Sequence, residues 1–307
     1  DLEANLLDLH ERLRAGTYRA TPVRRSWLRK EDGSARPLGL PILEDKIVQR
    51  AVVMLLEAVY ESVFENFCYG FRRNRNAHQA LSYLRTQCLA LNINWIVDAD
   101  VSGFFDNIDH KHLIAILKRK VNDGAIIRLI GKWLNAGVLE EGHLLTPEKG
   151  TPQGGVISPM LANIYLHTIL DEWFRTEVQP RLGGASFIVR FADDFVIGCT
   201  TRTDAERVFA VLPKRFQPFG LTIHPKKSRL VQFSRPYWKT GKGPGTFDFL
   251  GFTHYWGKTL NHQWTIKRKT RRPRLRRAMK AIWAWCQEAR HWAVPEQHKT
   301  LCAKLQG

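Results

Sequence analysis

The chain has 307 residues, of which 44% are hydrophobic and 25% are charged, and its 47 Lys and Arg exceed its 29 Asp and Glu to give a net charge of +18. This length and apolar content argue against a disordered chain and leave room for one or two domains. The basic surplus predicts a polyanionic partner, and nucleic acid is favoured over a membrane surface because no basic amphipathic anchor accompanies the charge.

Cysteine spacing and hydropathy further limit the class of protein that the sequence can encode. The five cysteines form no Cys-x-x-Cys pair, which indicates reduced thiols, most of them in the core. The longest apolar run, residues 51–56, is too short to cross a bilayer, and no signal peptide is recognisable. We therefore expect a cytoplasmic protein with no membrane partner. The start at Asp1 without a Met and the stop at Gly307 suggest a chain clipped at both ends.

The first part of the chain predicts helices on either side of a basic hairpin. Residues 2–15 carry leucines at helical spacing, and residues 45–64 carry a longer pattern. On the longer helix we expect one face to be buried, formed by Ile47, Ala51, Met54, Leu55 and Ala58. The Asp-Gly at 32–33 is a hairpin-turn signal. The hairpin carries three basic residues, Arg29, Lys30 and Arg36. Their side chains either fold over a triphosphate or are solvated.

A basic, aromatic turn at residues 69–75 precedes a helix that we expect from about Ala77. Arg-rich loops are commonly solvated. Because this loop stands just before an acidic strand, Arg72 and Arg75 could instead grip a backbone phosphate of template or primer.

Residues 93–101 predict a strand that ends in acid. Asp98 and Asp100 are two residues apart, so they emerge on the same face of that strand. The small residues that follow allow a ligand to approach the backbone, and of Phe104 and Phe105 we expect one ring in the core and one at a pocket wall. His110 and His112 point in different directions at the start of the next helix, so we expect no metal site there.

A Gly-rich turn at residues 150–155 holds one amide side chain, Gln153. It lacks the Gly-Lys-Ser/Thr ending of a P-loop, which argues against a nucleoside triphosphatase. Ser158 and Pro159 then predict the N-cap and first turn of a helix, whose N-terminus is a natural place for phosphate.

The central motif is the pair Asp193–Asp194 within residues 189–197. Aromatic and β-branched residues on both sides predict a strand, a tight turn and a second strand. An isolated Asp-Asp is usually a solvated loop, but here Asp100 supplies a third carboxylate from another strand end. Three such carboxylates offer the oxygen ligands that a pair of Mg²⁺ ions needs, with room for substrate phosphates.

The last third predicts one more capped helix, short strands and a basic helix. Residues 203–206 predict a capping box, Pro213 is expected to kink or end the helix that follows, and strands are expected at 230–233 and 247–252. Residues 236–246 predict a flexible loop. From Lys267 onward, basic residues interleaved with tryptophans favour a cationic helix for a duplex backbone over a solvated face. The order of elements predicts an α+β fold, with an antiparallel sheet backed by helices.

Four motifs in chain order, Asp-Val-Ser-Gly-Phe-Phe-Asp, Thr-Pro-Gln-Gly-Gly, Phe-Ala-Asp-Asp and Phe-Leu-Gly-Phe, resemble those of reverse transcriptases of the bacterial group II intron type, the maturase family. The resemblance implies a right-hand polymerase with fingers, an antiparallel-sheet palm backed by helices, and the start of a helical thumb. The fingers would span 1–90, and the palm with its primer grip 91–256, although part of 113–150 could belong to the fingers. The thumb, or domain X, would begin at 257–307 and be truncated.

The same resemblance implies roles for individual residues. Asp100, Asp193 and Asp194 would be the catalytic carboxylates and, with the Val101 carbonyl, would hold two Mg²⁺ ions, for which Mn²⁺ can substitute. Phe105 would lie under the nucleotide sugar and exclude a 2′-hydroxyl, and Gln153 would contact the sugar and phosphate. Lys227, or its neighbour Lys226, would lie near the pyrophosphate. The remaining implied contacts are with the triphosphate at Arg29, Lys30 and Arg36, with the primer at Phe249, Leu250, Gly251 and Phe252, and with the template–primer backbone at Arg72, Arg75, Lys267, Arg268, Arg271 and Arg272.

The implied activity is RNA-directed DNA polymerisation, with an RNA template, a DNA primer and dNTPs as partners and intron RNA as a further candidate. Attack of the primer 3′-hydroxyl on the α-phosphate would expel pyrophosphate. Two alternatives stay open: a splicing maturase that binds RNA without the chemistry, and a domesticated relative that serves CRISPR adaptation, defence or repair. The intact carboxylates argue against a pure binder, because three acids facing an RNA polyanion would only weaken binding.

Overall fold

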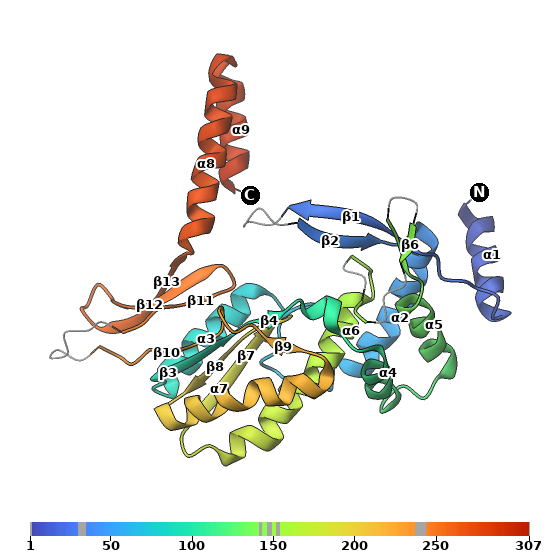
Figure 1. Ribbon diagram of the computed structural model, residues 1–307. Helices are drawn as coiled ribbons and strands as arrows, with labels where there is room; N and C mark the ends of the chain where they lie inside the picture. The colour runs from blue at the N-terminus through green and yellow to red at the C-terminus, as the bar shows by residue number, and fades with distance from the viewer. Residues whose placement is uncertain are drawn as a thin grey trace. The chain divides into compact units, whose positions relative to one another are not determined.

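The computed structural model describes residues 2–29, 35–140, 143–145, 149–151, 154–236 and 244–306, apart from the side chains of Arg36 and Leu144. The chain divides into two compact units, Asp1–Ser234 and Arg235–Gly307. Each combines helices with antiparallel strand pairs, as Figure 1 shows, so the predicted α+β class is confirmed.

The first unit is organised around a four-stranded antiparallel sheet. Its strand order is β10-β3-β8-β7, formed by β3 (Trp95–Ala99), β7 (Ser186–Phe191), β8 (Asp194–Cys199) and β10 (Arg229–Gln232). The predicted strand, tight turn and strand around the acid pair are thus β7 and β8. All but the end residues of these two strands are buried, which explains their runs of β-branched and aromatic residues.

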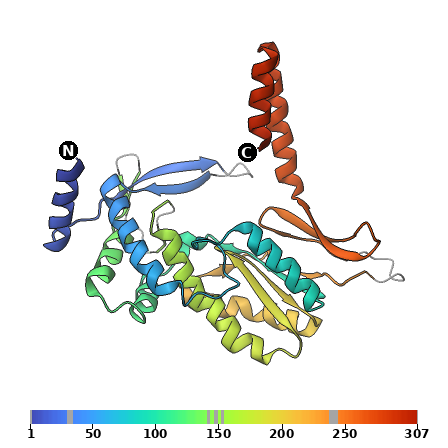
Figure 2. The same cartoon turned by 180° about the vertical axis from the view of Figure 1, so that it is seen from behind.

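Helices cover both faces of this central sheet (Figures 1 and 2). On one face, Phe195 stacks on Phe216 of α7 (Arg202–Phe216), with ring centroids 6.2 Å apart. On the other, Phe187 contacts Tyr83 of α3 (Ala77–Ala90), again at 6.2 Å. Because neighbouring strand residues face opposite sides, Asp194 is directed away from the face that packs on α7.

A second sheet in this unit carries the predicted basic hairpin. Its order is β2-β1-β5-β6, with β1 (Val23–Arg29), β2 (Ala35–Leu40), β5 (Val138–Glu140) and β6 (His143–Leu145). The turn at 30–34 lies outside the described residues. The surrounding helices are α1 (Leu2–Arg14), α2 (Leu43–Tyr60), α4 (His110–Lys118) and α5 (Gly124–Leu134). Two short strands, β4 (Val101–Ser102) and β9 (Thr222–Ile223), pair beside the acidic strand.

The buried face of α2 differs from our prediction. The stripe of Ile47, Ala51, Met54, Leu55 and Ala58 is exposed, with Met54 58% exposed. The helix instead buries the stripe that contains Asp45, Val48, Gln49, Val52, Val53, Leu56 and Tyr60. Both faces are largely apolar, so periodicity alone could not distinguish them. Two buried polar side chains of the second stripe have partners: the Asp45 carboxylate accepts a hydrogen bond from the Tyr18 hydroxyl, and Gln49 Oε1 accepts one from the Ile157 backbone N–H.

Two predictions of helix starts need correction, and of the two outcomes expected at Pro213, a kink or an end of the helix, the end is excluded. Helix α6 (Ser158–Leu166) has Ile157 at its N-cap, so Ser158 is already helical. Helix α7 is capped by Thr201, whose side chain accepts from the Asp204 backbone N–H, rather than by a box that starts at Thr203. Pro213 does not end that helix, which continues to Phe216.

The second unit contains a three-stranded antiparallel sheet and two helices. The strands are β11 (Phe247–Phe249), β12 (Phe252–Lys258) and β13 (Trp264–Thr270), followed by α8 (Arg272–Glu288) and α9 (Val294–Gln306). Residues 247–252 are therefore two strand ends around a turn, not one strand. The basic helix expected from Lys267 begins at Arg272, because 264–270 pairs with β12. Most of the expected flexible loop, residues 237–243, lies outside the described residues.

Two bulk predictions can be compared with the described structure. All five cysteines are free thiols, and Cys68, Cys88 and Cys199 are buried. In the described ranges, no helix has both the length and the apolar content needed to cross a membrane.

Candidate active site

Three acidic residues from distant parts of the chain meet at one end of the central sheet. Ala99 of β3 pairs with Phe195 of β8, so the next residues, Asp100 and Asp194, leave the ladder beside each other. On the other side of β8, Phe191 pairs with Asp194, which leaves Ala192 and Asp193 as a two-residue turn. The register of two strand pairs therefore brings these three acidic residues together.

The acidic side chains do not form a ready-made metal cage. Asp100 and Asp193 are half-buried and Asp194 is exposed. Across the described part of the chain, no three His, Cys, Asp or Glu side chains gather closely enough to hold a metal ion. The carboxylates and nearby backbone carbonyls are the donors that a hard divalent cation prefers. The residue types thus fit Mg²⁺, but the side chains would have to turn to hold it.

Lys227 contacts one of the three acids. Its Nζ lies 3.6 Å from Asp100 Oδ2; the Lys227 side chain is largely exposed, and the Asp100 side chain is about half exposed. The same loop holds the backbone of Asp100, because His224 N–H donates to the Asp100 carbonyl at 2.7 Å and Asp100 N–H donates to the Ser228 side-chain Oγ at 3.1 Å. Of the two candidate lysines, Lys227 is thus the one with an ion pair to Asp100.

Asp98 has a different environment from Asp100, although the two share a face of β3. Its Oδ2 accepts a hydrogen bond from Arg229 Nε at 3.1 Å, across the pairing of β3 with β10. One acid of the strand thus faces a neighbouring arginine, and the other stands at the strand end.

Behind the acid turn lies a buried charge pair that sequence reasoning missed. Arg190 and Asp171 are both fully buried, and Arg190 Nε donates to Asp171 Oδ1 at 2.8 Å. Burial alone would lower the pKa of Arg190, but the Asp171 carboxylate raises it above its usual value. Burial likewise opposes ionisation of Asp171, and the Arg190 charge brings its pKa below its usual range. The signal in the sequence was a single Arg in a predicted strand, with the apolar residues Val189 and Phe191 on either side of it.

Of the two phenylalanines after Asp100, one is buried, as expected, and the other is half-buried and packs against the core. Phe104 is 3% exposed and Phe105 is half-buried, and their rings meet edge to face at 5.3 Å. Val101 is buried in β4, before the turn at Gly103. The Phe105 ring therefore remains partly accessible beside the acidic strand end.

The Gly-rich turn is attached to the Phe105 segment. Thr151 N–H donates to the Phe105 carbonyl, and Gly150 N–H donates to the Ile108 carbonyl, both at 2.8 Å. Gly150 has a φ of +89°, and a Cβ there would lie 2.9 Å from the Asp106 carbonyl oxygen, so only glycine fits. Gln153 lies outside the described residues.

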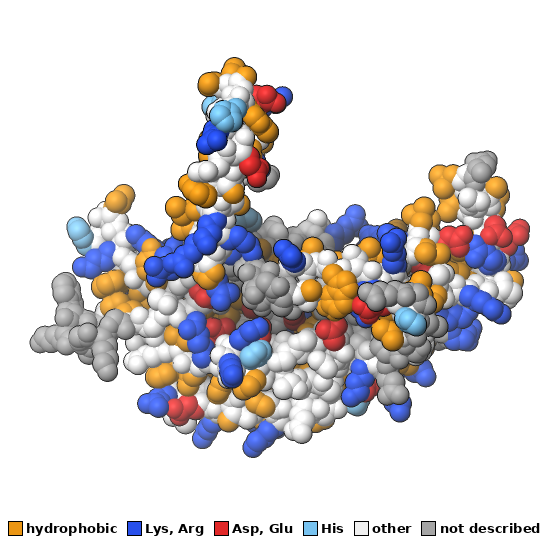
Figure 3. All heavy atoms as spheres, turned by 45° about the horizontal axis from the view of Figure 1, so that its top comes forward, with side chains coloured by type: hydrophobic (Ala, Val, Ile, Leu, Met, Phe, Trp, Pro, Cys, Tyr) orange, Lys and Arg blue, Asp and Glu red, His pale blue; other side chains and the backbone are white. Residues whose placement is uncertain are grey.

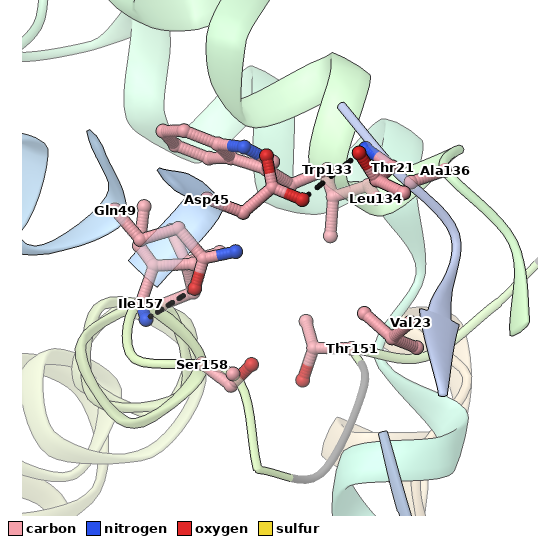
Figure 4. A pocket seen from close by; sticks show the side chains of 12 residues that line it. Thr21, Val23, Asp45, Gln49, Trp133, Leu134, Ala136, Thr151, Ile157 and Ser158 are labelled. Carbon is pink, nitrogen blue, oxygen red and sulfur yellow. Dashed lines mark hydrogen bonds between the residues drawn. The ribbon is translucent and has the colours of Figure 1, made fainter. Parts of the chain in front are cut away.

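A small cavity lies beneath this Gly-rich turn (Figure 4). Its volume is about 10 Å³, which is room for about one water molecule. Polar side chains that face it include Asp45, Gln49 and Thr151, and Thr151 Oγ1 has no hydrogen-bond partner in the described structure. This cavity is too small for a nucleotide, so any nucleotide site must lie elsewhere.

The predicted phosphate contacts of the first unit are only partly described. Arg29 is exposed at the end of β1. Lys30 lies outside the described residues, and Arg36 lies opposite Leu28 in the hairpin without a described side chain.

Arg72 does not fit the predicted phosphate contact. Its side chain is 3% exposed and pairs with Glu61 at 2.8 Å, while its other donors reach backbone carbonyls. Moving this buried guanidinium away from its hydrogen-bond partners would be costly, so the structure argues against the phosphate contact predicted for Arg72. Arg75 is half-buried and donates to both the carbonyl and the side chain of Asn66.

The predicted primer-grip residues form the turn of the β11–β12 hairpin. Phe249 is buried and Phe252 half-buried, and the two turn residues, Leu250 and Gly251, have φ values of +50° and +82°. Two positive φ values are typical of a type I′ hairpin turn. A Cβ at Gly251 would overlap the Arg274 guanidinium in its present position, so a larger residue there would require that side chain to move.

The basic residues of the second unit are exposed on a strand and a helix. Lys267 and Arg268 lie on β13, Arg272 begins α8, and all three are exposed. Arg271 is also largely exposed, and its Nε pairs with Asp248 at 3.0 Å. Figure 3 shows Lys and Arg side chains gathered where α8 follows β13.

Comparison with known proteins agrees with the motifs. A family model described as reverse transcriptase (RNA-dependent DNA polymerase) matches residues 28–254. The group II intron-encoded protein LtrA of Lactococcus lactis is 42% identical over 168 residues, which are 54% of this chain and 28% of LtrA. Protein YkfC of Escherichia coli is 38% identical over 226 residues, which are 64% of this chain and 59% of YkfC. The chain thus spans less than two thirds of the length of either relative.

Solved structures show the same fold at low identity. Telomerase from Candida albicans, in complex with the TWJ fragment of telomeric RNA, matches with a TM-score of 0.60 and 14% identity, over 83% of this chain and 46% of that one. Apo telomerase from Candida tropicalis matches with a TM-score of 0.57.

Proposed function

This chain belongs to the reverse transcriptase family, and from that premise we propose that it extends a DNA primer by copying an RNA template with dNTPs. The observation that carries the proposal is the meeting of Asp100 with the Asp193–Asp194 turn at one end of the central sheet. The identity with LtrA supports a group II intron type of template and partner RNA.

In this proposal the acids hold the divalent cation. Mg²⁺ or Mn²⁺, when held by Asp100, Asp193, Asp194 and the Val101 carbonyl, would lower the pKa of the primer 3′-hydroxyl and neutralise charge on the triphosphate. Asp100 would exchange its contact with Lys227 for the cation. Lys227 would then be free to neutralise the leaving pyrophosphate, which carries the charge that the broken bond releases.

The remaining residues would bind and select the substrate. The partly accessible Phe105 ring would lie under the incoming sugar and reject a 2′-hydroxyl by contact, and Gln153 would touch that sugar and its phosphate. Arg29, Lys30 and Arg36 would bind the triphosphate. The turn formed by Phe249, Leu250, Gly251 and Phe252 would hold the primer, and the backbone of the duplex would lie on Arg75, Lys267, Arg268, Arg271 and Arg272.

We propose that the chain is divided into fingers, palm and thumb in the order that the resemblance implies. Residues 1–90 would act as fingers, 91–256 as a palm that includes the primer grip, and 257–307 as the start of a thumb. The parallel pairing of β1 with β5 supports the idea that part of 113–150 works with the fingers.

Primer extension tests the proposal directly. The full chain is given an RNA template, an annealed DNA primer, dNTPs and Mg²⁺, beside an Asp193→Asn variant whose fold and RNA affinity are checked separately. We expect template-dependent extension by the wild type and none by the variant. Extension that survives in Asp193→Asn, or a folded wild type that binds the duplex without extending it, would refute the proposal.

A second candidate function is RNA binding in splicing without polymerisation. Nuclear intron maturase 4 of Arabidopsis thaliana is 29% identical over 161 residues, which are 48% of this chain and 18% of that protein. The net charge of +18 suits either function. If splicing is the sole role, Asp193→Asn will leave intron-RNA binding and splicing at wild-type levels, and no extension will be seen with either protein.

A further inference from the structure

We propose that Arg190, Asp171 and Asn163 are positioning residues that fix the backbone of the acid turn, so that Asp193 is held at the end of the sheet. The inference rests on the proposed polymerase function, because it concerns how the same site is assembled. None of the three side chains would touch the substrate. They would act through the Ala192–Asp193 peptide.

Arg190 reaches the turn itself. Its Nη1 donates to the Ala192 carbonyl at 2.9 Å, and that carbonyl belongs to the peptide that joins Ala192 to Asp193. Ala192 has a φ of +58°, a left-handed conformation that residues with a Cβ rarely adopt. A charge-assisted hydrogen bond from a buried guanidinium is a strong restraint on such a peptide. The bond therefore holds the strained residue immediately before Asp193.

The guanidinium is itself fixed from the opposite side. Its Nε and Nη2 donate to the two oxygens of Asp171 at 2.8 and 2.5 Å, and Nη1 also donates to Asn163 Oδ1 at 2.9 Å. A bidentate pair leaves the planar fork little freedom to rotate. Because Arg190 is fully buried, water does not compete for these donors.

The helix that carries Asn163 and Asp171 has an unusual course that brings them together. Asn163 lies in α6, and Asp171 lies in the π-helical segment His167–Glu172 that continues it. At about 100° per residue, eight residues of α-helix overshoot two turns by about 80°. The wider turns of a π-helix reduce that overshoot, so both side chains face Arg190. π-Helical turns are frequent at functional sites.

A third support comes from the loop before α3. Asn163 Nδ2 donates to the Gly70 carbonyl at 2.7 Å, and Tyr69 N–H donates to the Arg190 carbonyl at 2.9 Å. A Cβ at Gly70 would overlap the Ala192 backbone nitrogen. Gly70 and the Arg190 guanidinium thus both lie close to the backbone of the turn and restrict its position.

Stability alone does not account for this arrangement. A buried ion pair can be replaced by apolar side chains of similar volume with little change in stability, whereas loss of one partner is strongly destabilising. An apolar pair would fill the same space but could not donate to the Ala192 carbonyl. The double replacement therefore separates a positioning role from a merely structural one.

The main test is the variant Arg190→Met/Asp171→Leu in the full chain. We expect it to fold, to melt near the wild-type temperature and to bind the primer–template duplex with wild-type affinity. We expect single-turnover nucleotide addition at saturating dNTP to fall about 100-fold, since a small misplacement of a reacting group costs about that much. Mn²⁺ binding to the ternary complex, followed by electron paramagnetic resonance, should weaken about 10-fold, because Asp193 is no longer held.

Two single variants keep the inference open to refutation if the double variant fails to fold. Arg190→Lys retains a charge beside Asp171 but lacks the fork that reaches Ala192, so we expect a stable protein with the same loss of rate and of Mn²⁺ affinity. Arg215→Met is the matched control, because Arg215 donates to the Ile169 and Thr168 carbonyls of the same π-helical region without touching the turn. Its rate per folded molecule and its Mn²⁺ affinity should equal those of the wild type.

The possible outcomes separate this inference from the proposed function. If the wild type extends primers and folded Arg190→Lys or Arg190→Met/Asp171→Leu keeps the wild-type rate and Mn²⁺ affinity, the positioning role is overturned. An equal loss in Arg215→Met would also overturn it, because any weakening of that helix would then suffice. If the wild type itself extends no primer while Mn²⁺ affinity still falls only in the Arg190 variants, the proposed function fails and the positioning of Asp193 stands.

Discussion

The acid end of the central sheet and the basic surface of the second unit are built in opposite ways. Behind the acids, Arg190 and Asp171 are fully buried and fix the turn through several hydrogen bonds. On α8 no residue is buried, and its basic side chains are exposed. Chemistry on a reacting phosphate depends on position, whereas contact with a nucleic-acid backbone depends mainly on charge. The contrast indicates that substitutions in the first region change rate and those in the second change affinity.

The largest expected effect separates two acids of one strand. Asp100→Asn should slow nucleotide addition about 1000-fold, because a carboxylate ligand that contributes several kcal/mol to the transition state is lost. Asp98→Asn is the matched control, since Asp98 shares the face of β3 but contacts Arg229. Single-turnover extension measures both. Equal losses of rate in the two variants would mean that negative charge on this strand, not the position of Asp100, supports the reaction.

The next prediction concerns the stability of the second unit, in which His254 is buried. Burial and the nearby Arg268 charge lower the pKa of His254 from 6.5 to about 4. The unfolded chain therefore takes up a proton below pH 6.5 that the fold does not, so stability falls as the pH drops from about 6.5 to 4, by up to about 3 kcal/mol.

Hydrogen exchange of the β12 amides, corrected for the intrinsic rate at each pH, measures this loss. His254→Phe should remove most of the pH dependence, because a phenyl ring can replace the imidazole that stacks on Phe247. His291→Gln changes an exposed histidine and should leave it intact. A wild type whose β12 protection is the same at pH 7 and pH 5 would contradict the neutral, buried state of His254.

A smaller effect tests position within the first region. Phe105→Val should raise the use of ribonucleotides relative to deoxynucleotides about 10- to 100-fold, because a contact with the 2′-hydroxyl is removed. Phe104→Val should instead cost about 2 kcal/mol of stability and leave the sugar preference unchanged, since Phe104 is buried. Competition between rNTPs and dNTPs measures the ratio. An unchanged ratio in Phe105→Val would assign that ring to the core.

The smallest effect tests charge in the second region. Arg276→Gln/Lys280→Gln should weaken duplex binding about 10-fold and reduce the slope of log affinity against log salt by about 2, with the rate of the bound complex unchanged. Arg207→Gln/Lys214→Gln removes two exposed charges from α7 and should change neither. Fluorescence anisotropy over a salt series gives the slopes. A changed rate with an unchanged slope would reverse the comparison between the two regions.

Local patterns in the sequence were sufficient for the strands at the acid end. Strand alternation and the turn around Asp193 are encoded by neighbouring residues, so the strands β3, β7 and β8 could be predicted from local pattern, whereas the pairing of β3 with β8 joins distant parts of the chain. The basic composition near Lys267 was equally visible. The predicted helix was wrong only at its start, because residues 267–270 belong to β13, which pairs with the preceding strand β12.

Tertiary contacts explain what the sequence could not provide. The buried face of α2 depends on the hydrogen bond between Asp45 and Tyr18, and the burial of Arg72 depends on its ion pair with Glu61. The Arg190 pair depends on π-helical turns that no periodicity signals. In each case a polar side chain acquires its role from a distant neighbour.

The central claim is that Asp100 and Asp193, far apart in the sequence, share a divalent cation over a growing DNA end. A structure of the full chain with RNA template, DNA primer, dNTP and Mg²⁺ tests it most directly. We predict one Mg²⁺ with an oxygen from each of the two carboxylates at about 2.1 Å, with Asp100 released from Lys227. A bound nucleotide beside an Asp100 that is still paired with Lys227 and shares no cation with Asp193 would contradict the account.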